Sequence, residues 1–226
     1  MNKTKLNLRN VAMIFACLAV TAVFISCSKD NSGTLNKLGG SQSAIGQVGT
    51  TFNIPASIPG VGPISAEVTE LNDGVSTIVL STTVTNTEYR AMLNRAQEVK
   101  SISPEVVIEV NYRMTSDGIQ EVRPGGNHTL NIVKYNAKVG DVYTLATRSS
   151  SDVSLRREVT KVSNDNDYAW NGMNIKTIQT VETGREIPGL GSITYVTNHK
   201  FGIVGVKFSL EDGTALSFPI IGSVTN

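Results

Sequence analysis

The sequence predicts an all-β domain, mainly antiparallel and folded as a curved sheet, an open barrel or a sandwich, with one short amphipathic helix. Apolar and polar side chains alternate residue by residue, most clearly over residues 105–114, as in a half-buried strand. Asp-Gly pairs, which favour tight hairpins, stand between apolar runs at Asp73-Gly74, Asp117-Gly118 and Asp212-Gly213. Strands joined by such short turns must be antiparallel, because a parallel crossover needs about a dozen residues or more.

The alternation recurs along the chain, and one segment departs from it. We expect further strands over residues 76–85, 129–135, 141–147, 153–163, 172–182, 203–210 and 214–220. Between residues 87 and 100 the apolar side chains recur instead at helical spacing, at Tyr89, Met92, Leu93, Ala96 and Val99. Thr85 and Glu88 fit a capping box before this segment. We therefore expect one helix here, packed on the sheet by its apolar stripe.

Two stretches of the chain are similar to each other. Residues 58–65 read IPGVGPIS and residues 187–194 read IPGLGSIT, and the similarity continues past a one-residue gap into the following segment. We expect each stretch to be a loop–strand–turn–strand unit, with Gly60 and Gly189 at matching turn positions. Chance similarity is the alternative, because turn chemistry by itself favours Pro-Gly at the entry to a strand.

The N-terminal residues have the form of a secretion signal. The first ten residues carry Lys3, Lys5 and Arg9 and no acid, and residues 11–25 contain no charge. A basic stretch followed by a short apolar stretch is typical of a signal peptide. A transmembrane helix would need ~20 apolar residues to cross ~30 Å of hydrocarbon. We therefore expect residues 1–26 to be a signal peptide that is removed.

The residues at the expected cleavage point are Phe24-Ile25-Ser26-Cys27, and Ser28-Lys29-Asp30-Asn31 follows. The first group resembles the lipobox of bacterial lipoproteins, although Phe24 stands where that family more often has Leu. The second group resembles the start of lipoproteins of the Bacteroidota. The resemblance implies that the Cys27 thiol takes a diacylglycerol and that the new amine is acylated, so that fatty acids such as palmitate anchor the chain firmly. It also implies an outer-membrane location, on the periplasmic or the cell-surface face.

The rest of the chain divides into a tether and one domain. Residues 28–49 are rich in Gly and Ser with isolated apolar residues, so we expect residues 27–49 to be a flexible lipidated tether. We expect residues 50–226 to form a single β-rich domain, since such a length supports one sizeable core. Residues 135–213 resemble β-rich lipoproteins of the Bacteroidota, which implies a β fold and no particular activity.

Cysteine content and charge exclude several classes of chemistry. Cys17 lies in the expected signal and Cys27 is used by the lipid, so the mature chain has no thiol for a disulfide, a metal centre or a nucleophile. Without Lys3, Lys5 and Arg9, 17 of the 20 basic residues remain against 19 acidic residues, a net charge of −2. This balance lacks the basic stripe of a nucleic-acid-binding protein. A solvated strand face accounts for Arg156-Arg157, the only adjacent basic pair.

Candidate catalytic, cofactor and metal residues are few, and we assign none. His128 and His199 are dispersed and are expected to be structural or surface residues. No Ser-nucleophile or phosphate-loop motif occurs. Asp165 and Asp167 fit a solvated turn better than a calcium loop. Trp170 is expected to anchor the core rather than to form a sugar platform.

Three functional hypotheses remain. The first is a non-enzymatic envelope lipoprotein that binds an apolar or glycan ligand, or a partner protein, without any cofactor. The second is a structural or adhesive surface subunit that assembles through an edge strand. The third is a hydrolase with an unrecognised site, which a cleft with carboxylates of perturbed pKa would favour.

The expected anchor can be tested at Cys27. Replacing Cys27 with Ser should abolish fatty-acid labelling and release the domain from the membrane fraction, because no thiol remains to carry the diacylglycerol. The matched control is Cys17→Ser, which lies in the expected signal and should leave both properties unchanged. Labelled fatty acid that still migrates with the Cys27→Ser chain would show that the lipobox interpretation is wrong.

Overall fold

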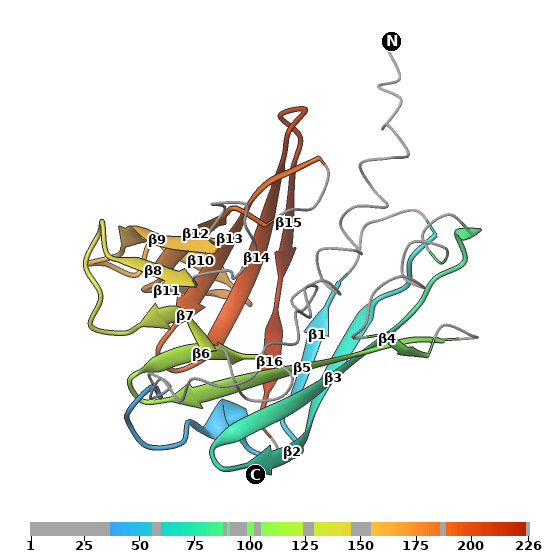
Figure 1. The fold of residues 1–226 in the computed structure, drawn as a ribbon, viewed down its shortest axis with the longest axis horizontal. Helices are drawn as coiled ribbons and strands as arrows, with labels where there is room; N and C mark the ends of the chain where they lie inside the picture. The colour runs from blue at the N-terminus through green and yellow to red at the C-terminus, as the bar shows by residue number, and fades with distance from the viewer. Residues whose placement is uncertain are drawn as a thin grey trace, which may run out of the picture.

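The computed structural model describes residues 37–55, 60–87, 90, 99–101, 105–123, 129–145, 155–185 and 189–224, and the expected all-β class is confirmed (Figure 1). The chain contains a 3-10 turn, η1 (Ala44–Gly46), and the strands β1 (Thr51–Ile54), β2 (Ile64–Asn72), β3 (Val75–Thr83), β4 (Val99–Ser101), β5 (Glu105–Thr115), β6 (Gly118–Val122), β7 (Thr129–Lys134), β8 (Val142–Leu145), β9 (Leu155–Val162), β10 (Tyr168–Trp170), β11 (Met173–Ile175), β12 (Ile178–Thr183), β13 (Leu190–Asn198), β14 (Gly202–Leu210), β15 (Ala215–Pro219) and β16 (Ile221–Ser223).

The strands form two large antiparallel sheets that curl into a half-barrel (Figure 1). The eight-stranded sheet has the order β16-β1-β2-β3-β5-β6-β7, with β4 added to β5, and the six-stranded sheet has the order β15-β14-β13-β12-β9-β8. The chain passes between the sheets at Ile220, which alone separates β15 from β16, and the terminal strands β7 and β8 lie in contact. The inner faces of both sheets therefore enclose one common interior.

The three Asp-Gly pairs form the predicted hairpin turns, between β2 and β3, β5 and β6, and β14 and β15. In the first turn Asp73 and Gly74 have φ of 47° and 70°, the left-handed region that a two-residue hairpin turn requires. At Gly118 a Cβ atom would lie 2.1 Å from the carbonyl oxygen of Val133 on β7, so only glycine fits beside that strand.

One large hydrophobic core fills the interior, and a small one lies apart from it. The large core contains Ile45 of η1 and inward-facing residues of both sheets. The sheet residues include Val68, Ile78, Ile119, Ile132, Ile193 and Phe208. The small core joins Trp170 and Ile175 of the β10–β11 hairpin to Val196 and Val204. Trp170 is 5% exposed, stacks on Phe201 at 4.6 Å and donates from Nε1 to the Ile220 carbonyl at 2.9 Å. Its predicted role as a core anchor is confirmed.

The described parts of the two similar stretches form matching strand–turn–strand units, as predicted, while residues 58–59 and 187–188 lie outside the described part of the chain. The first unit is β2–β3 in the eight-stranded sheet and the second is β13–β14 in the six-stranded sheet. Gly60 and Gly189 have φ of 83° and 82°, and each carbonyl accepts a backbone N–H at 2.9 Å. Ile64 and Ile193 are buried at 3% and 2% exposure. The flanking order also matches, since β5-β3-β2-β1 corresponds to β15-β14-β13-β12.

The predicted helix is only partly within the described residues. Thr87 and Arg90 are helical, and the Arg90 N–H donates to the Asn86 carbonyl at 3.1 Å, as in an α-helix. Residues 88–89 and 91–98 lie outside the described part of the chain. The expected end at residue 100 is wrong, because Val99–Ser101 forms β4 and pairs with β5.

The predicted tether is wrong for residues 37–49, which pack on the domain. Leu38 is buried and its N–H donates to Gln120 Oε1 at 3.3 Å, while Gln42 forms a bridge with Thr115 beside β5. Ile45 is 5% exposed and belongs to the large core. Two of the isolated apolar residues that were interpreted as tether residues, Leu38 and Ile45, are buried and hold this segment in place. Residues 1–36, with Cys27, lie outside the described part of the chain.

The predicted continuous strand over residues 172–182 is also wrong. Asn171 and Gly172, with φ of 44° and 78°, form a turn that pairs β11 with β10 in a separate two-stranded sheet. Lys176 and Thr177 then separate β11 from β12, which returns to the six-stranded sheet. The hairpin closes over the small core, and this gain in burial favours the break.

Candidate functional site

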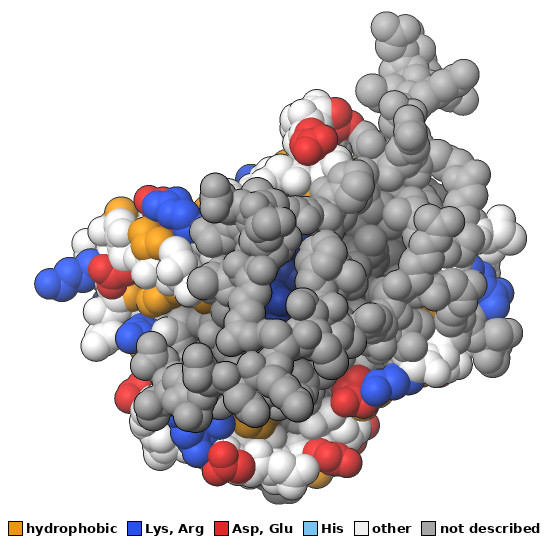
Figure 2. All heavy atoms as spheres, in the orientation of Figure 1, with side chains coloured by type: hydrophobic (Ala, Val, Ile, Leu, Met, Phe, Trp, Pro, Cys, Tyr) orange, Lys and Arg blue, Asp and Glu red, His pale blue; other side chains and the backbone are white. Residues whose placement is uncertain are grey.

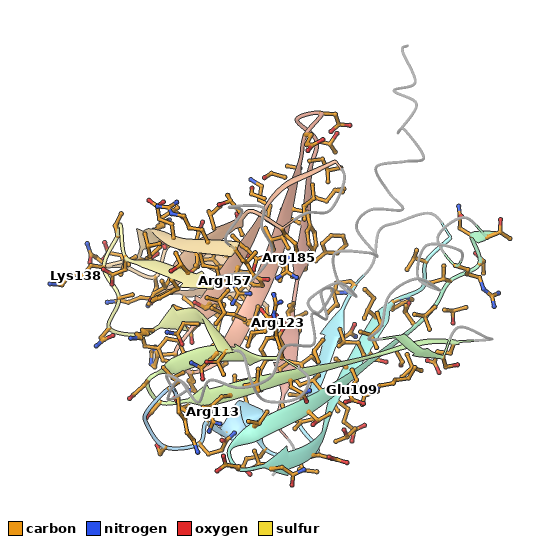
Figure 3. All side chains as sticks on the ribbon, in the orientation of Figure 1. Glu109, Arg113, Arg123, Lys138, Arg157 and Arg185 are labelled. Carbon is orange, nitrogen blue, oxygen red and sulfur yellow. The ribbon has the colours of Figure 1, made fainter. Side chains whose placement is uncertain are left out.

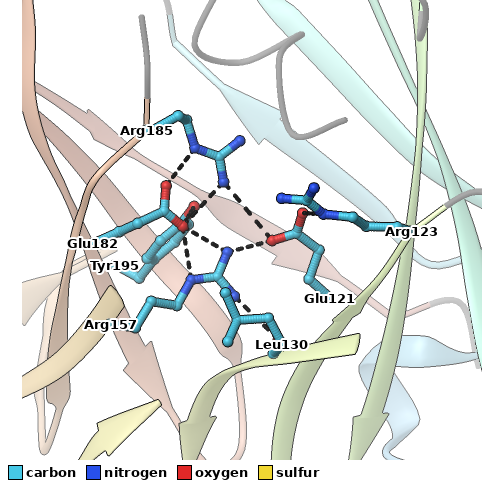
Figure 4. Close-up of polar contacts among 7 residues, drawn as sticks. All are labelled: Glu121, Arg123, Leu130, Arg157, Glu182, Arg185 and Tyr195. Atoms are coloured by element: carbon cyan, nitrogen blue, oxygen red, sulfur yellow. Dashed lines mark hydrogen bonds and ion pairs between the residues drawn. The ribbon is translucent and has the colours of Figure 1, made fainter. Parts of the chain in front are cut away.

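Five charged side chains converge in the interior between the two sheets (Figures 3 and 4). Glu121 lies on β6 and Arg123 follows that strand, whereas Arg157 lies on β9, Glu182 on β12 and Arg185 just after β12. The side chains of Arg157 and Glu182 are fully buried, those of Glu121 and Arg185 are 5% and 8% exposed, and that of Arg123 is 20% exposed. We call these five residues the charged site.

Arg157 lies at the centre of the charged site and joins the two sheets. Its Nε donates to Glu182 Oε2 at 2.7 Å, within the six-stranded sheet. Its Nη2 pairs with the carboxylate of Glu121, and its Nη1 donates to the carbonyl of Leu130 at 3.1 Å, both in the eight-stranded sheet. The guanidinium carbon also lies 5.2 Å from the centre of the Tyr195 ring, a cation–π distance. All three donating nitrogens of this buried cation thus have an acceptor.

The strand alternation explains why Arg157 is buried and Arg156 is not. Leu155, Arg157 and Val159 face the interior on β9, while Arg156 faces solvent and pairs with Glu158 at 2.6 Å. The interpretation of Arg156-Arg157 as a solvated face is therefore wrong for Arg157. In the alternation along this strand, Arg157 falls on the same face as the apolar residues Leu155 and Val159, which indicated that it is buried. This indication was overlooked because two adjacent arginines suggest a solvated surface.

Arg185 and Arg123 differ in how well their guanidinium nitrogens are hydrogen-bonded. Arg185 clamps the Glu182 carboxylate, with Nε donating to Oε1 at 2.5 Å and Nη2 donating to Oε2 at 3.0 Å. Arg123 Nε lies 3.9 Å from Glu121 Oε1, which is beyond hydrogen-bond length. Both of these atoms are buried and have no hydrogen-bond partner. One edge of the site is therefore incompletely paired, and Figure 4 shows only that long contact at Arg123.

Burial and ion pairing keep Glu182 and Arg157 charged and Tyr195 neutral at physiological pH. Burial by itself would raise the pKa of the Glu182 carboxyl, but Arg157 and Arg185 outweigh it and lower that pKa from 4.5 to about 2. Burial opposes the charge of Arg157, yet Glu182 and Glu121 hold its pKa well above the usual value. Burial also raises the pKa of Tyr195 well above the usual value, so that phenol stays neutral.

The charged site carries an excess of positive charge. Its three guanidiniums face two carboxylates, which leaves one positive charge unbalanced among the described residues. Burial lowers the pKa of Arg123, and Glu121 opposes that change, while Arg185 and Arg157 lower the pKa further. A guanidinium nevertheless stays charged in proteins, so the imbalance persists at neutral pH.

The residues weighed from the sequence lie elsewhere. His199 is exposed and contacts the Tyr135 ring edge-to-face at 6.4 Å, while His128 lies outside the described residues. Asp165 and Asp167 are exposed, as expected of a solvated turn, and Asp167 accepts from Lys161 and Ser163 at 2.8 and 2.7 Å.

Two further properties concern only the described residues. No group of three or more His, Cys, Asp or Glu side chains is placed there to hold a metal ion. Within the same part of the chain, no helix has both the length and the apolar character needed to cross a bilayer.

Sequence reasoning did not single out Glu121, Arg123, Glu182 or Arg185. Glu182 is in phase with the buried Thr180 on β12, but Ile178 and Val181 lie in opposite phases, so the sequence alone did not show its inward direction. Glu121 was less readable, because residues 118–121 are all buried and β6 shows no alternation. The N-terminal segment covers the outer face of β6 through Leu38 and Gln120, which removes the signal.

The comparisons with known proteins add little. No family model matches the chain, and no curated protein is similar to it. Among solved structures, the chain is similar to one from Bacteroides fragilis NCTC 9343 that is described as an exported protein with a YmcC-like fold. The identity is 10% and the TM-score 0.39, over 78% of this chain and 94% of that one. A likeness of this degree extends no function and no site residue to this chain.

The central role of Arg157 predicts a large difference between two neighbouring substitutions. Arg157→Leu should lower the free energy of unfolding by about 3–5 kcal/mol, because it leaves two buried carboxylates with too few partners. Arg156→Leu, on the exposed face of the same strand, should change it by about 0.5 kcal/mol or less. Chemical denaturation of both variants measures the difference. Equal losses would contradict the role assigned to Arg157.

The low pKa of Glu182 predicts a loss of stability in acid. Because the folded value of about 2 lies below the unfolded value of 4.5, the contribution of Glu182 is fully present above pH 4.5 and is lost as the pH falls toward 2. The loss should be on the order of 3 kcal/mol. Urea unfolding of the wild type and of Glu182→Gln from pH 6 to pH 2 provides the measurement, with the gap between the two proteins narrowing in acid. A gap that stays constant with pH would refute this assignment.

Proposed function

We propose that the chain is a lipid-anchored protein of the bacterial outer membrane that binds a polar ligand at the charged site between its two sheets, without catalysing a reaction. The anchor is supported by the secretion signal and by Cys27 at its end. The observation that carries the binding role is the charged site itself. If the charged site had only a structural role, apolar side chains at the same positions would give similar or greater stability, since buried ion pairs seldom add net stability.

The chemistry of the site supports binding over catalysis. Guanidinium groups hold their protons at all physiological pH values, so they are poor general acids and bases but good partners for oxygen-bearing ligands. The described carboxylates of the site are engaged by these guanidiniums, and the pKa of Glu182 is lowered rather than brought toward neutrality. Of the ligand classes considered from the sequence, a glycan fits the charged site better than an apolar molecule.

A second candidate function, a structural or adhesive surface subunit, has one observation in its favour. β8 is the terminal strand of the six-stranded sheet. Val142, the first residue of this strand, is 42% exposed, and Val139, just before the strand, is 64% exposed. Hydrophobic side chains gather at the surface on the side where β8 and β9 lie (Figure 2). Exposed apolar residues on a terminal strand suit pairing with another chain.

Native mass spectrometry of the protein released from its own membranes tests these alternatives. Under the proposal, part of the population should be heavier than the diacylated or triacylated chain by the mass of a small polar molecule, and Arg156→Gln, on the exposed face of β9, should keep that adduct. A stoichiometric protein subunit in place of the adduct would favour the second candidate function. A chain found only with its acyl groups would refute the binding role.

A further inference from the structure

We propose that the Arg123 guanidinium and the Glu121 carboxylate together hold an acidic or phosphorylated sugar, with the anionic group on Arg123 and a neighbouring hydroxyl on Glu121. This inference rests on the proposed function, because it names the ligand class of the same site. It is carried by the charge balance of the charged site, by the unequal pairing of its arginines and by the position of the two unpartnered atoms.

The first step is the charge balance. Three guanidiniums and two carboxylates share a largely buried space. The Tyr195 phenol beside them is held neutral by burial, which raises its pKa. A cation that is removed from water needs a compensating partner to be stable there. The residues that the structure describes leave one cation of the site without such a partner. An anion from outside the chain would complete the balance.

The second step identifies which arginine is left over. Arg157 donates to Glu182, Glu121 and Leu130, and Arg185 makes two hydrogen bonds to Glu182. Among the described residues, Arg123 has only the long contact of 3.9 Å with Glu121, and its Nε is buried without an acceptor there. Its side chain is also the most exposed of the three arginines, at 20%. Arg123 therefore lies nearest the solvent and keeps a planar fork that suits a carboxylate or phosphate.

The third step concerns Glu121, which has one satisfied oxygen and one unsatisfied oxygen. Oε2 pairs with Arg157, whereas Oε1 is buried, has no hydrogen-bond partner and faces Arg123 Nε. An ionised carboxylate only accepts hydrogen bonds, so Oε1 needs a donor such as a hydroxyl. A donor fork beside an open acceptor is complementary to an acidic group beside a hydroxyl. Acidic and phosphorylated sugars have that arrangement, while acetate and sulfate, which carry no hydroxyl at neutral pH, match only the fork.

The test uses the full lipidated protein in detergent and measures ligand-induced changes in melting temperature together with calorimetric titration. The probes are glucuronate and glucose 6-phosphate for the two sources of the anion, glucose as the neutral sugar, and sulfate as the anion without a hydroxyl. We expect either sugar acid to bind, glucose to bind at least tenfold more weakly, and sulfate to bind more weakly than the preferred sugar acid. Whichever of the two sugar acids binds more tightly identifies the anion.

Three variants locate the binding. Arg123→Gln should lose at least tenfold in affinity for the sugar acid, Glu121→Gln should lose discrimination between the sugar acid and sulfate, and the exposed Arg156→Gln should match the wild type. Arg123→Gln should also melt at or above the wild-type temperature without ligand, because it removes an unbalanced buried charge. A purely structural Arg123 would not give that combination.

Several outcomes would overturn the inference. These are equal binding by the wild type and Arg123→Gln, no binding of any anionic probe, or an unliganded Arg123→Gln that melts as early as Arg157→Leu. Sulfate that binds as tightly as the sugar acids would overturn the role of Glu121. If a neutral glycan co-purifies in native mass spectrometry while the anionic probes fail, the proposed function stands and this inference does not.

Discussion

The fold depends on satisfying one buried cation, the guanidinium of Arg157. Its acceptors come from both sheets, with Glu182 on β12 and both Glu121 and Leu130 on the β6–β7 side. A buried charge without partners costs several kcal/mol, so the two sheets must keep the separation and the register that bring these acceptors together. A slip of one residue on β9 would turn Arg157 to the outer face and place Arg156 inside. The network thus selects one register among those that the apolar residues alone would permit.

Local signals in the sequence were enough for the fold class but not for this network. The alternation of side chains and the turns at Asp73-Gly74 and Asp212-Gly213 act over a few residues, so they could be recognised directly. The partners of Arg157 lie 25 and 36 residues away along the chain. No local pattern encodes such a contact, and a charged pair in isolation is most simply interpreted as solvated. The tether was misjudged for a related reason, since Ile45 gains its burial from distant strands.

The internal repeat shows how a site can arise on one of two similar units. Both units present an isoleucine to the core and begin at a glycine with positive φ. Two residues after Ile64 the first unit has Ala66, and two residues after Ile193 the second has Tyr195. At this position the first unit therefore has a small apolar side chain, whereas the second unit has the Tyr195 ring, which lies against Arg157. The second unit therefore belongs to the wall of the charged site, whereas Ile64 and Ala66 of the first unit belong to the hydrophobic core.

The corrected N-terminal boundary changes how the domain would sit on a membrane. Because residues 37–49 pack on the domain, the linker from a lipidated Cys27 would run only to Lys37, a contour of at most ~35 Å. Lys37 pairs with Asp73 at the β2–β3 turn, and Leu38 contacts Gln120 on β6. A lipid anchor would thus hold this end of the half-barrel toward the bilayer. Arg123 comes after the end of β6, beyond Gln120 in the direction away from the β5–β6 turn, so Arg123 would lie farther along this strand from the anchored end than the contact of Leu38 with Gln120 does.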